Sequence, residues 1–266
     1  MGESMFREEL QRDLWHASQG GLSKDVRNIL SNFMVDINCV GGHNRTTSLM
    51  EASSNGHKEV VHLLLDGGAN PIQTDVYGPT PLHRAACRGH KEVVQLLLNR
   101  GVDPNSGSYL GNTALHMAAE SGHKEVVELL LDRGVDPKAQ NNDGNTALHR
   151  AAARGHKEVV QLFLNRGVDP NIASNNGNTA LHWAASDGQK EVVQLLLDKG
   201  ANPKALNNDE NTVLHEAAIH GHIDVVKLLL DKGANPKAQN IQGETALQTA
   251  ADQRHGDVVK LLSKYQ

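Results

Sequence analysis

A 15-residue segment that recurs at a fixed interval constrains the fold of this chain more than any other feature. The stretch TALHRAAARGHKEVV begins at Thr146, and copies of it start every 33 residues. The close copies begin at Thr80, Thr113, Thr179 and Thr212, the weaker ones at Thr47 and Thr245, and a degenerate unit covers residues 13–30. Eight units fill nearly all of the 266 residues, so no second domain is expected. A period of this length is typical of solenoids, in which each unit packs only on its neighbours.

Each unit predicts two short helices separated by glycine. Thr80 is a good N-cap, and Pro81 suits the first helical position, where its missing N–H is not needed. Gly89 ends this helix at a place that favours positive φ, and a second helix is expected from about Lys91 to just before Gly101. Its run of valine and leucine is too apolar for a free surface helix, so neighbouring units must cover it.

The pattern T-P-L-H-x-A-A, then G-H, then L-L-L-x-x-G, resembles the ankyrin repeat, from Asp13 to the C-terminus. The resemblance implies an all-α dominated fold, an ankyrin-repeat solenoid of paired antiparallel helices joined by β-hairpin-like loops. It further implies that the loop tips and the exposed side of each first helix form a concave surface that binds partners.

We expect one ankyrin-repeat domain over residues 1–266. Its parts are an N-terminal extension or capping helix (1–12), a degenerate capping repeat (13–44), six regular repeats (45–244) and a C-terminal capping repeat (245–266). Phe6, Leu10 and Leu14 are spaced for one helix face, and Trp15 is expected to help seal that end. In the last repeat Gln248 replaces the first histidine, and we interpret His255-Gly256 as an inverted Gly-His pair.

Charge and composition exclude several functional classes. The chain has 26 Lys+Arg against 31 Asp+Glu and a net charge of −5, which argues against nucleic-acid binding. It shows no secretory signal and no apolar run long enough to span a bilayer. Cys39 and Cys87 lack metal-site spacing and suit a reducing compartment. We therefore expect a cytoplasmic protein, with the nucleus as an alternative, that is a monomer and has no membrane partner.

Two histidines and a carboxylate in the repeated stretch, His149, His156 and Glu158, suggest a metal or acid–base site at first sight. The same two histidines recur in most units, and a catalytic centre is not copied at each step of a stack. A buried imidazole needs hydrogen-bond partners, and a regular stack supplies them. We therefore predict a non-enzyme with no catalytic residue, no metal site and no cofactor.

Function is expected at the positions that vary between units. Aromatic residues make up only 3% of the chain, yet Tyr77, Tyr109 and Trp183 fall at such positions, and Tyr and Trp are enriched in interface hot spots. Two arginine pairs are spaced i, i+4 on first helices. The predicted partner-binding residues are Val76, Tyr77, Arg84, Arg88, Tyr109, Leu110, Met117, Glu120, Arg150, Arg154, Trp183, Asp187, Glu216 and His220.

We favour a non-catalytic scaffold or adaptor that binds an unidentified partner protein or peptide on its concave face. The charged residues fit either internal salt bridges between units or a mixed-charge groove for a peptide. A second hypothesis is an ankyrin array that senses a phosphorylated nucleotide, because Arg150 and Arg154 could hold phosphate and Trp183 could stack a base. A third is an engineered or effector-type binding scaffold.

Three further positions depart from the repeat or resemble a modification site. Glu210 stands where other units have glycine, and Gln189 replaces the second histidine, where an amide could take over its hydrogen bond. The segment LSNFMVDIN, with Leu30, Asp36 and Asn38, resembles the pattern recognised by the asparaginyl hydroxylase of ankyrin repeats. That resemblance implies hydroxylation of Asn38; the alternative is an ordinary turn asparagine.

Overall fold

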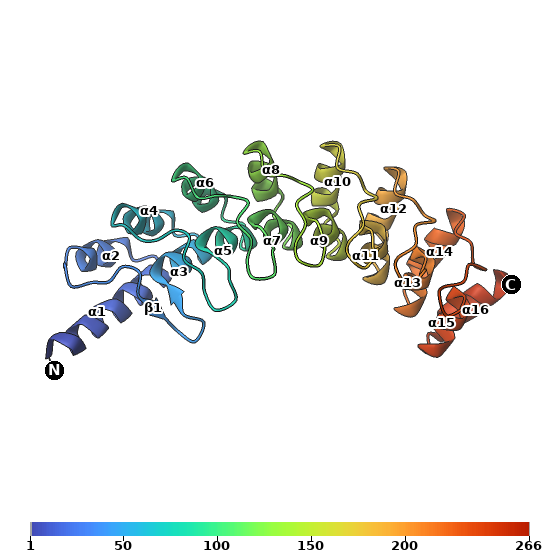
Figure 1. Cartoon of the computed structure of the whole chain (residues 1–266), viewed down its shortest axis with the longest axis horizontal. Coiled ribbons are helices and arrows are strands. Elements are labelled where there is room, and N and C mark those ends of the chain that lie inside the picture. The colour runs from blue at the N-terminus through green and yellow to red at the C-terminus, as the bar shows by residue number, and fades with distance from the viewer. Residues whose placement is uncertain (1, 266) are drawn as a thin grey trace. The chain divides into compact units, whose positions relative to one another are not determined.

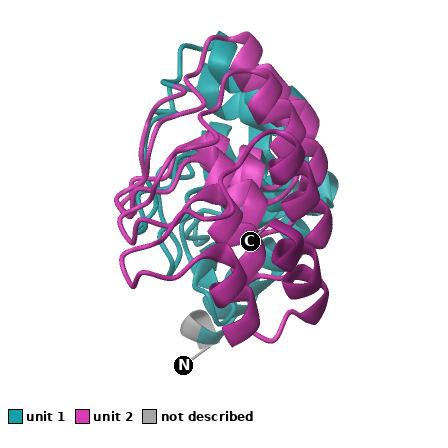
Figure 2. Cartoon of the chain, turned by 90° about the vertical axis from the view of Figure 1, so that its right-hand side faces the viewer, with its two compact units in different colours: residues 1–118, 125–136 teal, residues 119–124, 137–266 magenta. Residues whose placement is uncertain are grey.

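The computed structural model describes residues 2–265, and within them it contains sixteen α-helices, one short 3-10 helix and one two-stranded sheet (Figure 1). The chain divides into two compact units (Figure 2): unit 1 comprises residues 1–118 and 125–136, and unit 2 comprises residues 119–124 and 137–266. The boundary runs through α7 (Ala114–Glu120) and α8 (Lys124–Asp132).

Unit 1 contains three further helix pairs and the small sheet. Its elements are α1 (Gly2–Gln19), α2 (Ser23–Leu30), β1 (Val40–Gly41), β2 (Thr46–Thr47), α3 (Ser48–Ser54), α4 (Lys58–Asp66), α5 (Pro81–Cys87) and α6 (Lys91–Asn99). The strands β1 and β2 are antiparallel, with Val40 opposite Thr47.

Unit 2 contains four helix pairs and a terminal 3-10 turn. Its elements are α9 (Ala147–Ala153), α10 (Lys157–Asn165), α11 (Ala180–Ser186), α12 (Lys190–Asp198), α13 (Val213–Ile219), α14 (Ile223–Asp231), α15 (Ala246–Asp252), α16 (Gly256–Leu262) and η1 (Ser263–Tyr265).

Within each unit, first helices pack on first helices and second helices on second helices. In unit 2, α11 packs between α9 and α13, and α12 packs between α10 and α14; in unit 1, α3 packs against α5 and α4 against α6. The two helices of one repeat also contact each other, as α9 and α10 do. This sequential packing confirms the predicted helix-dominated ankyrin stack. Contacts between the ends of the loops, such as the isolated bridge of Ala173 with Thr179, are the only strand-like pairings that unit 2 shows in its described part.

The helix ends follow the predicted signals. Thr80 is the N-cap of α5 with Pro81 directly after it, and Gly89 follows the helix at φ +77°. A Cβ has little strain-free room at this left-handed conformation, which explains the glycine. The second helix begins at Lys91, as predicted.

Small and branched residues build the core between successive repeats. In α9 and α10, Ala151, Ala152, Val159 and Val160 are at most 1% exposed, and Phe163 is fully buried. Alanine on the first helix lets the neighbouring helix approach closely, while the longer side chains of the second helix fill the space between the helix layers. The core therefore uses the repeated positions and leaves the variable ones outside.

The first histidine is part of the scaffold in the five repeats that contain it, at positions 83, 116, 149, 182 and 215. The backbone N–H of Thr146 donates to Nδ1 of His149 (3.0 Å), so Nε2 carries the proton and donates to the carbonyl oxygen of Ile172 (2.9 Å). His149 thus joins the helix start of its own repeat to the loop that follows. Nε2 of His149 also bonds the carbonyl oxygen of Asn178 (3.2 Å). His182 and His215 make the equivalent bonds to the carbonyl oxygens of Asn211 and Glu244, so the predicted structural role is confirmed.

The second histidine ties each repeat to the one before it. Nε2 of His156 bonds the carbonyl oxygen of Glu120 (2.8 Å), and His222 bonds that of Ser186 (2.8 Å). Where the sequence has Gln189 instead, its amide Nε2 donates to the carbonyl oxygen of Ala153 (3.1 Å). The amide therefore replaces the imidazole as a donor, as the sequence predicts.

The first helix covers both the predicted N-terminal extension and the start of the predicted capping repeat. Helix α1 runs without a break through the expected junction between residues 12 and 13. Its C-terminal half is the packed half, because Leu14 is fully buried while Phe6 is 48% exposed. Trp15 does contribute to closing this end, since its indole nitrogen donates to Oγ1 of Thr46 (3.1 Å). The segment of α1 around Phe6 is thus less buried than the segment around Leu14.

The interpretation of His255-Gly256 as an inverted pair is wrong. His255 keeps the position of the second histidine, and its Nε2 bonds the carbonyl oxygen of Ile219 (2.9 Å). The residue that replaces glycine is Arg254, which adopts φ +63°. Gly256 takes the next position, at the start of α16. The hydrogen bond of His255 to the preceding repeat is therefore kept, and the substitution falls on the glycine position, where Arg254 adopts a positive φ.

Glu210 also occupies a left-handed position. Its φ is +58°, while Gly144 and Gly177 at the same place in other repeats have +75° and +77°. The glycine of the other repeats is explained by this conformation, because a side chain at positive φ costs free energy that glycine avoids.

Candidate functional site

The predicted aromatic residues of unit 1 lie on exposed loop tips. Tyr77 and Tyr109 are each 65% exposed, Leu110 is 63% exposed and Val76 is 43% exposed. A Cβ added to Gly78 would lie 2.7 Å from the ring of Tyr109, so this ring packs directly over the glycine of the preceding tip. The four residues form an exposed apolar patch on neighbouring loops.

The predicted first-helix residues of unit 1 differ in ion pairing and in exposure to solvent. Arg84 is held in an ion pair with Asp75, nine residues earlier in its own repeat, and the Asp75 side chain is 2% exposed. Arg88 is exposed at the C-cap of α5, and Met117 in α7 is half-buried. Arg84 is therefore committed to its own repeat, while Arg88 faces solvent.

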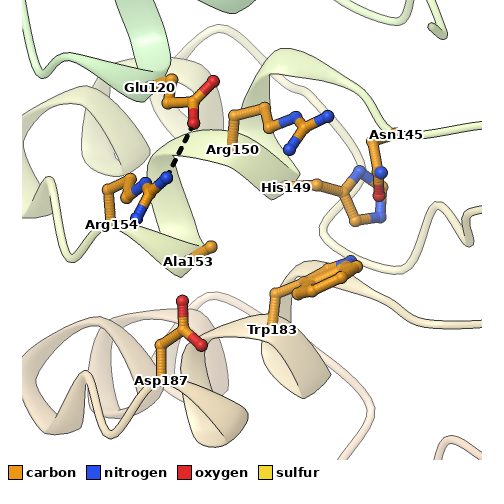
Figure 3. Close-up of a pocket in the computed structure, with 8 residues that line it drawn as sticks. All are labelled: Glu120, Asn145, His149, Arg150, Ala153, Arg154, Trp183 and Asp187. Atoms are coloured by element: carbon orange, nitrogen blue, oxygen red, sulfur yellow. Dashed lines mark hydrogen bonds and ion pairs between the residues drawn. The ribbon is translucent and has the colours of Figure 1, made fainter. Parts of the chain in front are cut away.

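Unit 2 brings five predicted residues together in one pocket of about 130 Å³ (Figure 3). These are Glu120, Arg150, Arg154, Trp183 and Asp187, which come from three successive repeats. Arg150 lies on α9 and Trp183 lies on α11, so the flat indole forms one side of the pocket and the arginines the other. We call this the Arg150–Trp183 pocket.

Charges in the pocket are partly paired. Nη2 of Arg154 lies 3.0 Å from Oε1 of Glu120, with the two side chains 60% and 29% exposed. Within the described residues, the ion pair of Arg150 is a long one with Asp143, at 4.0 Å, and the Asp143 side chain is 69% exposed. Asp187 completes the pocket on α11's side. Two cations and two carboxylates thus line the same small space.

Two donors at this pocket are left without a partner. Among the described residues, neither Nε1 of Trp183 nor Nε of Arg150 has a hydrogen-bond acceptor, although both atoms are buried. A buried donor without an acceptor costs about 1–3 kcal/mol. This is the arrangement expected at a site where a ligand or ordered water supplies the acceptor.

Three residues that line the pocket were missed by sequence reasoning: Asn145, His149 and Ala153. Of these, His149 was set aside because it belongs to the repeated scaffold. His149 keeps its scaffold bonds and still contributes a wall to the pocket. A repeated residue can therefore line a pocket when variable residues of neighbouring repeats surround it. The sequence of one repeat alone does not reveal such a pocket.

The remaining predicted residues lie further along unit 2. Oε1 of Glu216 accepts from Nδ2 of Asn207 (3.0 Å) and of Asn211 (3.2 Å). Burial raises the pKa of Glu216, and these two hydrogen bonds oppose the rise. His220 is exposed at the C-cap of α13. Beyond it, Asp209, Glu244 and Asp252 line a second, acidic hollow of about 310 Å³, so the first-helix side of unit 2 changes from mixed to negative charge.

The described part of the chain contains no group of three or more His, Cys, Asp or Glu side chains placed to hold a metal ion. None of its helices, over residues 2–265, has the length and apolar character needed to cross a membrane.

A family model described as ankyrin repeats in three copies matches the chain five times in overlapping windows. The matches cover residues 14–108, 75–141, 115–207, 162–240 and 200–266. Together they include nearly the whole chain, and the protein belongs to the ankyrin-repeat family. Ankyrin repeats are in general protein–protein interaction modules without catalytic activity. No curated protein is similar enough to the chain to count as a match.

Proposed function

We propose that this protein is a non-catalytic binding module that holds a segment of a partner protein along the first-helix face of unit 2. We define this face by α9, α11 and α13 with the loop tips that precede them. The Arg150–Trp183 pocket carries the proposal, because variable residues from successive repeats gather there around buried donors that lack acceptors. Scaffold histidines bond backbone carbonyls and are not available for chemistry.

The shape and charge of the face suit an extended segment. The Arg150–Trp183 pocket offers an aromatic wall and a cation, and the acidic hollow at Asp209 and Glu244 offers the opposite charge two repeats further on. A partner with an acidic residue followed by basic residues would match this order of charges. The exposed tips at Tyr77 and Tyr109 are a separate candidate contact surface within unit 1. We also propose that this protein is a monomer and that it is cytoplasmic.

The test is affinity capture of partner proteins from host lysate, quantified by mass spectrometry. The face variant is Arg150→Ala/Arg154→Ala/Trp183→Ala. The matched control, Lys157→Ala/Glu158→Ala/Lys190→Ala, changes exposed residues at the starts of α10 and α12. We expect partners enriched by the wild type and the control to be lost with the face variant. Equal enrichment by all three proteins would show that binding uses another surface.

A phosphorylated nucleotide is the second candidate ligand. In its favour, two arginines and one tryptophan line a single pocket. Against it, Glu120 already pairs with Arg154, and Asp187 adds a further negative charge. A thermal-shift panel of nucleotides tests this candidate, and a rise in Tm that Arg150→Ala abolishes would favour it over a protein segment.

A further inference from the structure

Two arginines occupy the same place in different repeats but have different surroundings. Arg84 and Arg150 each follow the first histidine of their repeat. Arg84 has a carboxylate of its own, because Asp75 forms an ion pair with it and is almost fully buried. Oδ1 of Asp75 also accepts the backbone N–H of Tyr77 (2.7 Å), which fixes the carboxylate in the turn. The repeat of Arg84 thus contains both halves of a buried ion pair.

The repeat of Arg150 lacks the acidic half. The residue that corresponds to Asp75 is Asn141, a neutral amide, and its Oδ1 accepts the backbone N–H groups of Asp143 (3.0 Å) and Asn145 (2.9 Å). The one carboxylate that pairs with Arg150 in the described structure is Asp143, at 4.0 Å and largely in solvent. A guanidinium whose side chain is only 28% exposed therefore lacks a buried counter-charge at the position where its counterpart has one.

A second donor distinguishes this pocket. Nε is without an acceptor in both arginines, but only the Arg150 site adds the buried indole N–H of Trp183, which also lacks one within the described chain. Figure 3 shows the indole across the pocket from the Arg150 guanidinium, with its nitrogen on the side toward His149 and Asn145. An indole N–H can only donate and a guanidinium can only donate, so what these two donors lack is an acceptor.

The charge balance limits which acceptor fits. Glu120 neutralises Arg154, and Asp187 lies on the same pocket, so the only cation without a close partner there, among the described residues, is Arg150. One negative charge would give Arg150 a close partner. Asp187 repels any anion in the pocket, so it opposes a singly charged carboxylate less than a phosphate group, which carries about −1.5 to −2 at neutral pH. A neutral carbonyl would satisfy a donor but leave the guanidinium without a close counter-charge.

We propose that the Arg150–Trp183 pocket binds the side-chain carboxylate of an aspartate or glutamate from the partner segment, with the Arg150 guanidinium and the Trp183 indole N–H as its donors. The incoming carboxylate takes the part that Asp75 plays for Arg84. This inference rests on the proposed function, because it names the partner residue that the first-helix face selects.

The indole N–H groups provide a direct readout. The chain has two tryptophans, and Trp15 already donates to Oγ1 of Thr46 at 3.1 Å in unit 1, so its resonance serves as an internal reference. The full chain, labelled with ¹⁵N, is titrated with two pools of short peptides that have blocked ends and a fixed central residue, glutamate or glutamine. Inorganic phosphate is the third probe, and Trp183→Phe assigns the resonance.

We expect the glutamate pool to shift the Trp183 indole resonance and leave that of Trp15 unmoved. Hydrogen bonds to charged groups contribute about 1.5–3 kcal/mol, so the glutamine pool should bind at least about tenfold more weakly. The matched variant is Asn141→Asp, which gives Arg150 the internal carboxylate that Arg84 has. It should keep the fold and lose the response to the glutamate pool, while Asp143→Asn should keep the response.

Three results would overturn the inference. Equal shifts from both peptide pools would mean that the pocket binds peptide without recognising a carboxylate, which leaves the proposed function intact. If phosphate shifts the Trp183 resonance and neither peptide pool does, both this inference and the proposed binding of a protein segment are contradicted. A response that persists unchanged in Asn141→Asp would show that Arg150 is not the group that binds the carboxylate of the peptide.

Discussion

Arg154 at the C-cap of α9 reaches back 34 residues to Glu120 in the preceding repeat, with Nη2 and Oε1 3.0 Å apart. Because the arginine side chain is 60% exposed, solvent screens the pair. A double-mutant cycle of Arg154→Ala and Glu120→Ala should give a coupling energy below about 1 kcal/mol. Urea unfolding at low salt provides the measurement. A coupling above about 2 kcal/mol would show that the pair stabilises the stack rather than shaping the pocket.

Acid should destabilise this protein through its scaffold histidines. Burial lowers the pKa of His182 to about 4 and also lowers the pKa values of His83 and His215. In the unfolded chain a histidine has a pKa of about 6.5, so between about pH 6.5 and pH 4 the unfolded state binds more protons. The free energy of unfolding is therefore highest above that window and falls as the pH drops through it.

The contribution of His182 can be isolated with His182→Gln. Glutamine already occupies this position as Gln248, where its Oε1 accepts the N–H of Thr245 at 2.7 Å. The variant should lose part of the pH dependence measured by urea unfolding at pH 7.5 and pH 5. The other buried histidines remain and serve as the internal control. A pH slope identical to that of the wild type would contradict the assigned role of His182.

Replacing Glu210 with glycine should stabilise the protein by about 0.5–1 kcal/mol, because Glu210 adopts φ +58° and glycine adopts such angles without steric cost. The larger freedom of glycine in the unfolded chain offsets part of the gain. Chemical denaturation checks the value, with Glu210→Ala as the control that keeps a Cβ and should give no gain. Equal stabilisation by both variants would point to charge removal instead of backbone strain.

Asn38 remains the predicted hydroxylation site. Its Oδ1 accepts the backbone N–H of Asn70 at 2.7 Å, as Oδ1 of Asn171 accepts that of Asn202. After incubation with the asparaginyl hydroxylase, the peptide that contains Asn38 should gain one oxygen atom and the peptide that contains Asn171 should not. The control is Asn38→Ala, which removes the residue that would be hydroxylated. Mass spectra without the added oxygen would end the prediction.

Local signals predicted most of the fold because each repeat carries them in full. Thr80, Pro81 and Gly89 define one helix through capping and backbone preference, and these forces act within a few residues. The strained position of Glu210 was visible for the same reason, since glycine fills it in neighbouring repeats. The mistake at His255 came from reading a residue pair without its partner, the carbonyl of Ile219 36 residues away.

The candidate site was predictable only in part. Variation among the repeats identified Glu120, Arg150 and Trp183, but it did not show that they share a pocket or that His149 borders it. It also treated Arg84 and Arg150 alike, because the contact of Arg84 with Asp75 depends on the position of the loop tip.

By itself the sequence determined the repeat length, the register of the helices, the buried faces and the scaffold role of the histidines, because capping, glycine conformation and apolar periodicity are short-range properties copied in every unit. Only the tertiary structure decided which charges are already paired and which are left over. Arg154 meets Glu120 through the stacking of successive repeats, whereas Arg150 and Trp183 keep buried donors without acceptors at one pocket. Those pairings depend on side chains that are distant in sequence and a few ångströms apart in space.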